Sequence, residues 1–269
     1  MRYGPPKKSF GATLKKVLGP ILLILVFGFK WLAKLKFVIP ALIKFLPVAL
    51  KTGGSMILMI GVYTMMYGWW FALGFVLLLF VHECGHLVAA KRLGLPVSAP
   101  VFIPFMGAFI ALKEAPKNAW IEAQVGIGGP LLGSFGALVS YGMFLVTGEP
   151  IFRALAYTGF FLNLFNLAPI GFLDGGRIVT ALSPWLWLVG TGAVVALMFY
   201  HFNFLLLLIL IMSLPRLFSL FRKRTEEEKR YFEVTPAQRT LMGFLYFGLA
   251  ASLAVGMKFI IDAEQLAQR

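Results

Sequence analysis

The chain has 269 residues, of which 59% are hydrophobic and 13% charged, and its mean hydropathy is +0.85. A soluble domain of this length is far less apolar, so the sequence predicts a multi-pass membrane protein. The net charge of +14 does not indicate nucleic acid, because ten of the 25 basic residues lie among leucines, isoleucines and phenylalanines in residues 1–51. A basic apolar segment of this kind favours a bilayer with anionic headgroups as its partner.

Residues 1–53 form the first predicted region, a basic amphipathic segment at the membrane interface. Lysines recur along residues 11–51, and three prolines there, Pro20, Pro40 and Pro47, prevent a single long helix. We therefore expect short helices that lie in the interface or dip into it. A short membrane span is predicted next, at residues 54–68, and a second one at about 70–92.

The second span carries the most informative run in the chain, Val81-His82-Glu83-Cys84-Gly85-His86. Glu83 is the only acidic residue among the first 113, and no charged residue lies between Thr52 and Val81. Histidines four apart lie on one face of a helix, where both rings can bind one metal ion, and Glu83 beside them can act on a water molecule. Ionisable groups at membrane depth are costly and usually functional, so simple hydrogen bonding is the weaker interpretation. The pattern predicts metal chemistry within a membrane.

Residues 95–113 differ from the spans on either side. They are rich in β-branched and aromatic residues and contain three prolines, which argues against a spanning helix and predicts a short membrane-associated β-hairpin. The hairpin edge is suited to pairing with an extended peptide, as a substrate clamp. A structural hairpin that contacts no substrate is an equal alternative. The candidate clamp residues are Phe102, Ile103, Phe105, Gly107 and Phe109.

Five further spans are predicted, at about residues 119–146, 152–169, 185–200, 203–221 and 240–261. The fold class is therefore an all-α polytopic membrane protein with about seven transmembrane helices, N-terminal interfacial amphipathic helices and a short membrane-associated β-hairpin. Residues 54–221 are expected to form the core, and residues 222–269 a charged, solvated cytoplasmic connector followed by a C-terminal transmembrane helix. Lysine and arginine are concentrated in the loops at one end of the spans, which predicts a cytoplasmic N-terminus in the cell membrane.

A catalytic metal needs a third protein ligand if its fourth position is to hold water. The remaining candidates in or beside apolar segments are Glu122, Glu149, Asp174 and His201. Only Asp174 has a dedicated setting, since Pro169 precedes it and two glycines follow it. Such residues can open a membrane helix where its backbone lines a cavity, although a purely structural turn is the alternative. A broken helix over about 152–180 is expected to present Asp174 to the metal.

Two motifs in order resemble the site-2 protease family of intramembrane zinc metalloproteases. They are His82-Glu83-Cys84-Gly85-His86 and Asn166-x-x-Pro169-x-x-x-x-Asp174-Gly175. The resemblance covers about residues 55–180 and is to a compact form, because the sequence contains neither a PDZ-like insertion nor a CBS domain. A small-residue segment between the motifs, from Gly128 to Gly133, also fits, and Gly129 and Gly133 are interpreted as a helix-packing pair.

The resemblance implies a zinc metalloendopeptidase that cleaves transmembrane protein substrates, as in regulated intramembrane proteolysis. It assigns His82, His86 and Asp174 as ligands of one zinc ion, Glu83 as catalytic base, and Asn166 as a residue that orients substrate or stabilises the oxyanion. Proteases that trim prenylated C-termini are excluded because they take their third ligand from Glu-x-x-x-Asp, which this sequence lacks. A metal-bearing membrane chaperone or transporter without proteolytic activity is the remaining alternative.

Overall fold

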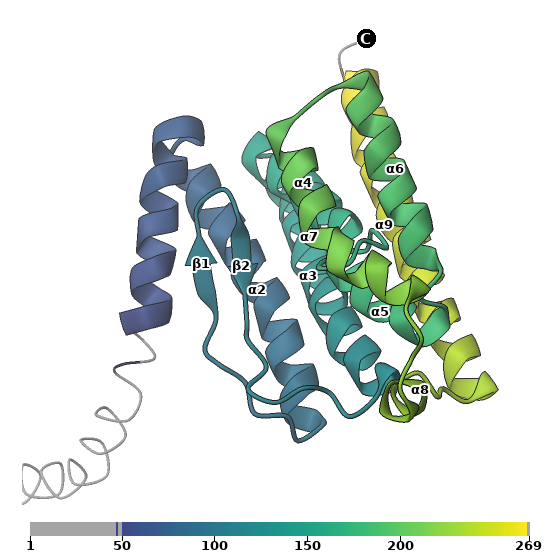
Figure 1. The fold of residues 1–269 in the computed structure, drawn as a ribbon. Coiled ribbons are helices and arrows are strands. Elements are labelled where there is room, and N and C mark those ends of the chain that lie inside the picture. Colours follow the sequence, from purple (N-terminus) through teal and green to yellow (C-terminus); the bar gives the residue numbers. More distant parts are fainter. Residues whose placement is uncertain (1–46, 48–49, 268–269) are drawn as a thin grey trace, which may run out of the picture. The chain divides into compact units, whose positions relative to one another are not determined.

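A computed structural model describes residue 47 and residues 50–267 of the chain. The interfacial helices predicted for residues 1–53 therefore lie almost entirely outside the described residues. Residues 50–67 are helical. The elements that follow, labelled in Figure 1, are α2 (Trp69–Arg92), β1 (Val101–Ile103), β2 (Gly107–Phe109), α3 (Ala119–Thr147), α4 (Pro150–Asn166), α5 (Asp174–Leu182), α6 (Leu186–Tyr200), α7 (Phe204–Phe221), α8 (Glu226–Tyr231) and α9 (Pro236–Ala267).

The described part of the chain is mostly helical and has the apolar helices of an integral membrane protein. Three helices are long and apolar enough to cross a membrane, namely Trp69–Arg92, Ala119–Thr147 and Pro236–Asp262. Shorter apolar helices cover Leu186–Tyr200 and Leu206–Phe221. Large apolar side chains such as Val146 and Phe244 are exposed on the outer faces, where a bilayer would cover them. Seven crossings remain a prediction.

Helix α3 is the centre of the packing, since it contacts α2, α4, α5 and α9. Its glycines allow the backbones of α2 and α3 to approach closely, because a Cβ on Gly85 of α2 would overlap the backbone of Gly128. Asn118 caps the start of α3, where its side chain accepts a hydrogen bond from the Ile121 N–H at 2.9 Å. The interior between α3, α4, α5 and α9 is apolar and includes Phe160 and Met242.

The predicted hairpin is confirmed. β1 and β2 pair antiparallel, with Val101 opposite Phe109 and Phe102 opposite Ala108. Phe102 anchors the hairpin, because its side chain is 2% exposed and packs with Met59 and Val76 in one apolar cluster.

The predicted break in the chain before Asp174 also exists. Helix α4 ends at Asn166, and α5 begins at Asp174 after a turn of seven residues. The two segments lie so close that a Cβ on Gly175 would overlap the carbonyl groups of Leu167 and Ala168. Glycine after the aspartate is therefore required by a close backbone approach.

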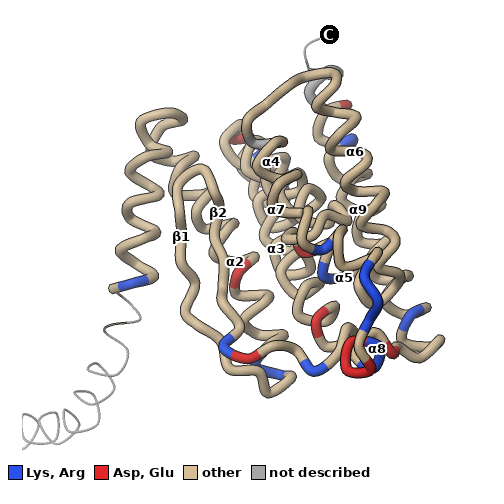
Figure 2. The backbone as a smooth tube through the Cα atoms, in the orientation of Figure 1, with Lys and Arg blue, Asp and Glu red and all other residues tan. Residues whose placement is uncertain are grey.

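The charged run after α7 is partly structured. Thr225 and Glu228 form a capping box at the start of the short helix α8. Figure 2 shows lysine, arginine, aspartate and glutamate gathered where α8 lies, at the end of the bundle that also contains the start of α3 and the end of α2. None of the α8 residues is buried, but Tyr231 at its end is half-buried and contacts α3.

Candidate metal centre

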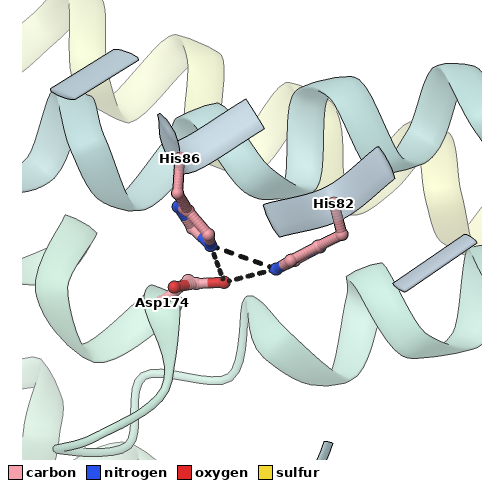
Figure 3. Close-up of side chains that lie close together, drawn as sticks. All are labelled: His82, His86 and Asp174. Atoms are coloured by element: carbon pink, nitrogen blue, oxygen red, sulfur yellow. Dashed lines mark hydrogen bonds and ion pairs between the residues drawn. The ribbon is translucent and has the colours of Figure 1, made fainter. Parts of the chain in front are cut away.

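Three side chains from two distant parts of the sequence converge on one point, as Figure 3 shows. His82 and His86 project from successive turns of α2, and Asp174 is the first residue of α5. The Asp174 Oδ2 atom lies 3.1 Å from His82 Nε2 and 3.2 Å from His86 Nε2, and the two Nε2 atoms are 3.1 Å apart. All three side chains are buried.

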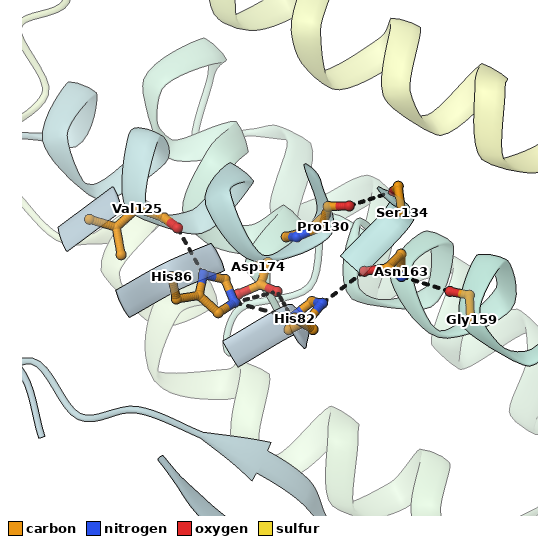
Figure 4. Close-up of polar contacts among 8 residues, drawn as sticks. All are labelled: His82, His86, Val125, Pro130, Ser134, Gly159, Asn163 and Asp174. Atoms are coloured by element: carbon orange, nitrogen blue, oxygen red, sulfur yellow. Dashed lines mark hydrogen bonds and ion pairs between the residues drawn. The ribbon is translucent and has the colours of Figure 1, made fainter. Parts of the chain in front are cut away.

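The tautomer of both imidazoles follows from their second nitrogens, which Figure 4 shows in contact with acceptors. His82 Nδ1 lies 2.8 Å from Asn163 Oδ1, and His86 Nδ1 lies 2.8 Å from the Val125 carbonyl oxygen. The Asn163 amide is oriented because its Nδ2 donates to the Gly159 carbonyl at 2.7 Å. Both acceptors can only accept, so each Nδ1 donates, and a neutral ring in this tautomer has its lone pair on Nε2.

These atoms fit a divalent metal and fit simple hydrogen bonding poorly. Two Nε2 lone pairs and a carboxylate oxygen would repel each other at 3.1–3.2 Å with no proton between them. Ligands of a tetrahedral zinc at about 2.0–2.1 Å are spaced by roughly 3.3 Å, close to these separations. A dication also balances two buried carboxylates, those of Asp174 and Glu83. The donor set of two histidines and one aspartate is typical of zinc.

Glu83 is placed beside this centre but does not join it. Its side chain comes from the same turn of α2 and is 4% exposed. Among the described residues, its Oε2 atom has no hydrogen-bond partner. A buried carboxylate oxygen without a partner destabilises the fold, and proteins usually keep such a group only where it has a function. Glu83 is therefore available for proton transfer next to the three ligands.

The glycines of α3 make room for the centre. A Cβ on Gly129 would overlap the His86 ring, and a Cβ on Gly133 would overlap the Asn163 amide. These contacts agree with the packing interpretation of Gly129 and Gly133, and they add a second role. The two glycines leave space for a ligand and for the group that orients the other ligand.

The other sequence candidates lie elsewhere. The exposed His201 follows α6. Glu149 precedes α4 and, together with Cys84, contributes to the lining of an apolar cavity. Neither is part of the ligand cluster found in the described residues. Asn166 is half-buried at the end of α4, one turn after Asn163, and its assigned role remains a proposal.

The five candidate clamp residues do not share one environment. Phe102 is buried in the apolar cluster and anchors the hairpin to the helices. Ile103 and Gly107 are half-buried, whereas Phe105 is 64% exposed and Phe109 is 49% exposed. Phe105 also has a left-handed backbone with φ of 66°, and its N–H donates to the Tyr63 hydroxyl at 3.1 Å. Only the exposed members of this set could meet a substrate without rearrangement.

Sequence analysis missed Asn163. Its side chain is 1% exposed and orients His82. A signal did exist, because Asn163 is an amide within an apolar span, where polar side chains usually have a functional partner. The nearby Asn166 belongs to the motif that resembles the site-2 protease family, whereas Asn163 lies outside that motif.

Comparison with known proteins agrees with this geometry. The profile of peptidase family M50 matches residues 70–157. Zinc metalloprotease MJ0392 of Methanocaldococcus jannaschii is 29% identical over 135 residues, which cover 47% of this chain. The aligned region spans 39% of that protein's length. The family match contains His82, Glu83 and His86 and the glycines of α3, and Asp174 lies beyond its end.

The family match and the ligand cluster are independent observations that meet on one helix. The match extends from α2 through the hairpin and α3 to the start of α4, and the cluster adds a third ligand from α5 that completes a zinc-type donor set. The chain is therefore similar to peptidase family M50 over residues 70–157, and the ligand cluster of His82, His86 and Asp174 is of the zinc type.

Proposed function

We propose that the protein is an intramembrane zinc metalloprotease that hydrolyses peptide bonds in transmembrane segments of protein substrates. The observation that carries this proposal is the buried Oε2 atom of Glu83, which has no hydrogen-bond partner in the described part of the chain. Glu83 lies on the same apolar helix as two of the three converging ligands. A structural metal site has no use for such a carboxylate, whereas a hydrolase needs a base at that place.

The proposed chemistry divides between the ion and the side chains. A zinc ion held by His82, His86 and Asp174 supplies Lewis acidity, which lowers the pKa of water to about 7 and polarises a carbonyl group. Glu83 accepts the proton of the attacking water and returns it to the nitrogen of the leaving amine. Asn166 is proposed to orient the substrate or to donate to the developing oxyanion. Asn163 and the Val125 carbonyl keep both imidazoles in the ligating tautomer.

The substrate must present an extended backbone, because a helix hides its peptide groups in internal hydrogen bonds. We propose that the hairpin of β1 and β2 holds the locally unwound segment by adding it as a strand. The hairpin is anchored by Phe102, and it exposes Phe105 and Phe109. These two aromatic side chains are the parts of the proposed clamp that face outward.

The proposed placement in the membrane follows the positive-inside rule. Basic residues cluster around the end of α2, the start of α3 and helix α8 (Figure 2), and we assign this end to the cytoplasm. With seven crossings, the N-terminus is then cytoplasmic in the cell membrane, and residues 1–53 contact anionic headgroups. The metal centre lies in the cytoplasmic half, because His86 is about one and a half turns from the basic end of α2.

Glu83→Gln separates proteolysis from metal binding without a change in side-chain shape. We expect the variant to retain zinc and to lose cleavage of a transmembrane model peptide by about 100- to 10,000-fold. Asp174→Ala is expected to lose both zinc and cleavage, and the exposed His201→Ala to keep both. Equal cleavage by wild type and Glu83→Gln would contradict the proposal. Zinc binding without cleavage of any substrate in a broad panel would favour a metal-bearing chaperone or transporter.

A further inference from the structure

A charged side chain from α7 lies between α3, α5 and α6. Arg216 is half-buried, and its Nη2 donates to Glu122 Oε1 of α3 at 2.7 Å. Its Nη1 donates to the Gly176 carbonyl of α5 at 3.2 Å. The guanidinium carbon also lies 5.3 Å from the centre of the Trp187 ring of α6. One planar group therefore contacts three helices besides its own.

The carbonyl that Arg216 contacts belongs to the first turn of α5, two residues after Asp174. This oxygen accepts from three side chains, since Thr180 Oγ1 lies at 2.9 Å and Trp187 Nε1 at 2.8 Å in addition to Arg216. Thr180 is on α5 itself and Trp187 on the next helix, so Arg216 is the donor that connects this turn to α3.

The Glu122 carboxylate that accepts from Arg216 is also held in place by a second partner. Glu122 Oε2 accepts a hydrogen bond from the Tyr231 hydroxyl of α8 at 2.6 Å, so both carboxylate oxygens have partners. Glu122 is buried in the first turn of α3, three residues before Val125, whose carbonyl orients His86. The same turn of α3 therefore holds His86 directly and holds Arg216 through Glu122.

We propose that Arg216 is a positioning residue for the metal centre. It fixes the first turn of α5, and with it Asp174, relative to the turn of α3 that orients His86. The inference rests on the proposed metal centre but not on proteolysis. Its role depends on the planar fork, because one nitrogen faces the carboxylate and the other the carbonyl, which a lysine ammonium cannot reproduce in the same geometry.

The test compares Arg216→Lys with Arg239→Lys in the full-length protein in detergent. Arg239 is a matched control, because its Nη1 donates to the Leu182 carbonyl at 2.8 Å, at the opposite end of α5 from Asp174. Zinc affinity is measured by competition with a chromophoric chelator, without substrate. The ligand geometry is followed by the visible absorption of the cobalt-substituted protein, and stability by thermal unfolding.

We expect Arg216→Lys to weaken zinc binding by about 10- to 100-fold, the usual range for residues that support a metal ligand, and to change the cobalt spectrum. Arg239→Lys should lower the unfolding temperature by a similar amount while zinc affinity and the cobalt spectrum stay unchanged. Unchanged zinc binding in Arg216→Lys, or an equal loss in both variants, overturns the proposal.

Glu122→Gln provides the test if Arg216→Lys cannot be obtained folded, because it keeps the side chain's shape and removes only the charge that holds the guanidinium. Its zinc affinity should also fall, whereas wild-type affinity would overturn the proposal. A failure of proteolysis is distinguishable from both results, since it would leave these zinc measurements unaffected.

Discussion

Replacing Asn163 by leucine should weaken zinc binding more than it disturbs packing. The two side chains have the same number of heavy atoms, but leucine cannot accept the hydrogen bond that His82 Nδ1 donates at 2.8 Å. The Gly159 carbonyl, which accepts from Asn163 Nδ2, lies one turn earlier in the same helix and retains its backbone partner. The main loss is therefore the acceptor that fixes the His82 tautomer.

The magnitude follows from this single unsatisfied group. A buried donor without a partner costs about 1–3 kcal/mol. His82 can avoid that cost by moving its proton to Nε2, but the ring then cannot bind the metal. Zinc affinity should fall by about 10- to 100-fold, which equals roughly 1.4–2.7 kcal/mol of binding free energy.

Asn163→Asp supplies the opposite change at the same atom. A carboxylate accepts the Nδ1 proton more strongly than an amide and increases the basicity of the ligating nitrogen. We expect zinc affinity at or above that of the wild type, together with a metal-free protein that is less stable because it buries another charge. Ser134→Ala is the control, because the Ser134 hydroxyl is buried in α3 and donates to the Pro130 carbonyl of the same helix.

The assay is a chelator competition in detergent, accompanied by thermal unfolding with and without zinc. We expect Asn163→Leu to bind zinc more weakly than the wild type does, and Asn163→Asp to bind it at least as tightly as the wild type. Ser134→Ala should have the zinc affinity of the wild type. If leucine at this position binds zinc as tightly as asparagine does, or if aspartate is as weak as leucine, Asn163 does not act through the His82 tautomer.

Three further predictions concern other parts of the chain. Gly129→Ala places a methyl group on the His86 ring and should reduce zinc content after dialysis. In the control Gly142→Ala the new methyl group meets nothing within 4 Å, and the substitution should stabilise its helix by about 0.5–1 kcal/mol in thermal unfolding. Equal zinc content in both variants would refute the steric argument. Phe105→Asn relieves a left-handed backbone strain of about 1 kcal/mol, so a variant that is at least as stable but cleaves more slowly would support a substrate contact, and unchanged cleavage would remove it. Burial and a neighbouring carboxylate raise the pKa of Tyr231. The contribution of this tyrosine to stability is therefore complete below the unfolded pKa of about 10 and is lost as the pH rises further. Tyr231→Phe should show a smaller fall in unfolding temperature between about pH 9 and 11 than the wild type does, and an identical fall would contradict this linkage.

The helix that carries the metal motif could be predicted almost to the residue, because its signals are local. A charge-free apolar run begins it, and Lys91 and Arg92 end it just before Gly94, which adopts a left-handed φ of 73°. The third ligand was also predictable, since proline and glycine mark the break before Asp174. The predicted start of the last helix at residue 240 was late, because its first turn at Pro236 is polar and lacks the apolar pattern.

The supporting contacts could not be predicted because they join residues far apart in sequence. Asn163 and His82 are separated by 81 positions, and Arg216 and Glu122 by 94. No repeating pattern in the sequence indicates that two such distant residues are in contact. Each of them alone resembles an isolated polar side chain in an apolar helix. The charged run after α7 was predicted to be a solvated connector, and its composition gave no indication that Tyr231 reaches α3.

The separation of the ligands along the chain has a consequence for the integrity of the fold. His86 and Asp174 are 88 positions apart, and the only cysteine, Cys84, offers no disulfide within the chain. An ion bound to both would close a long loop and remove conformational freedom from the unfolded chain, as a covalent cross-link does. In this protein, the proposed zinc ion would then also act as a cross-link that holds the short helix α5 against α2.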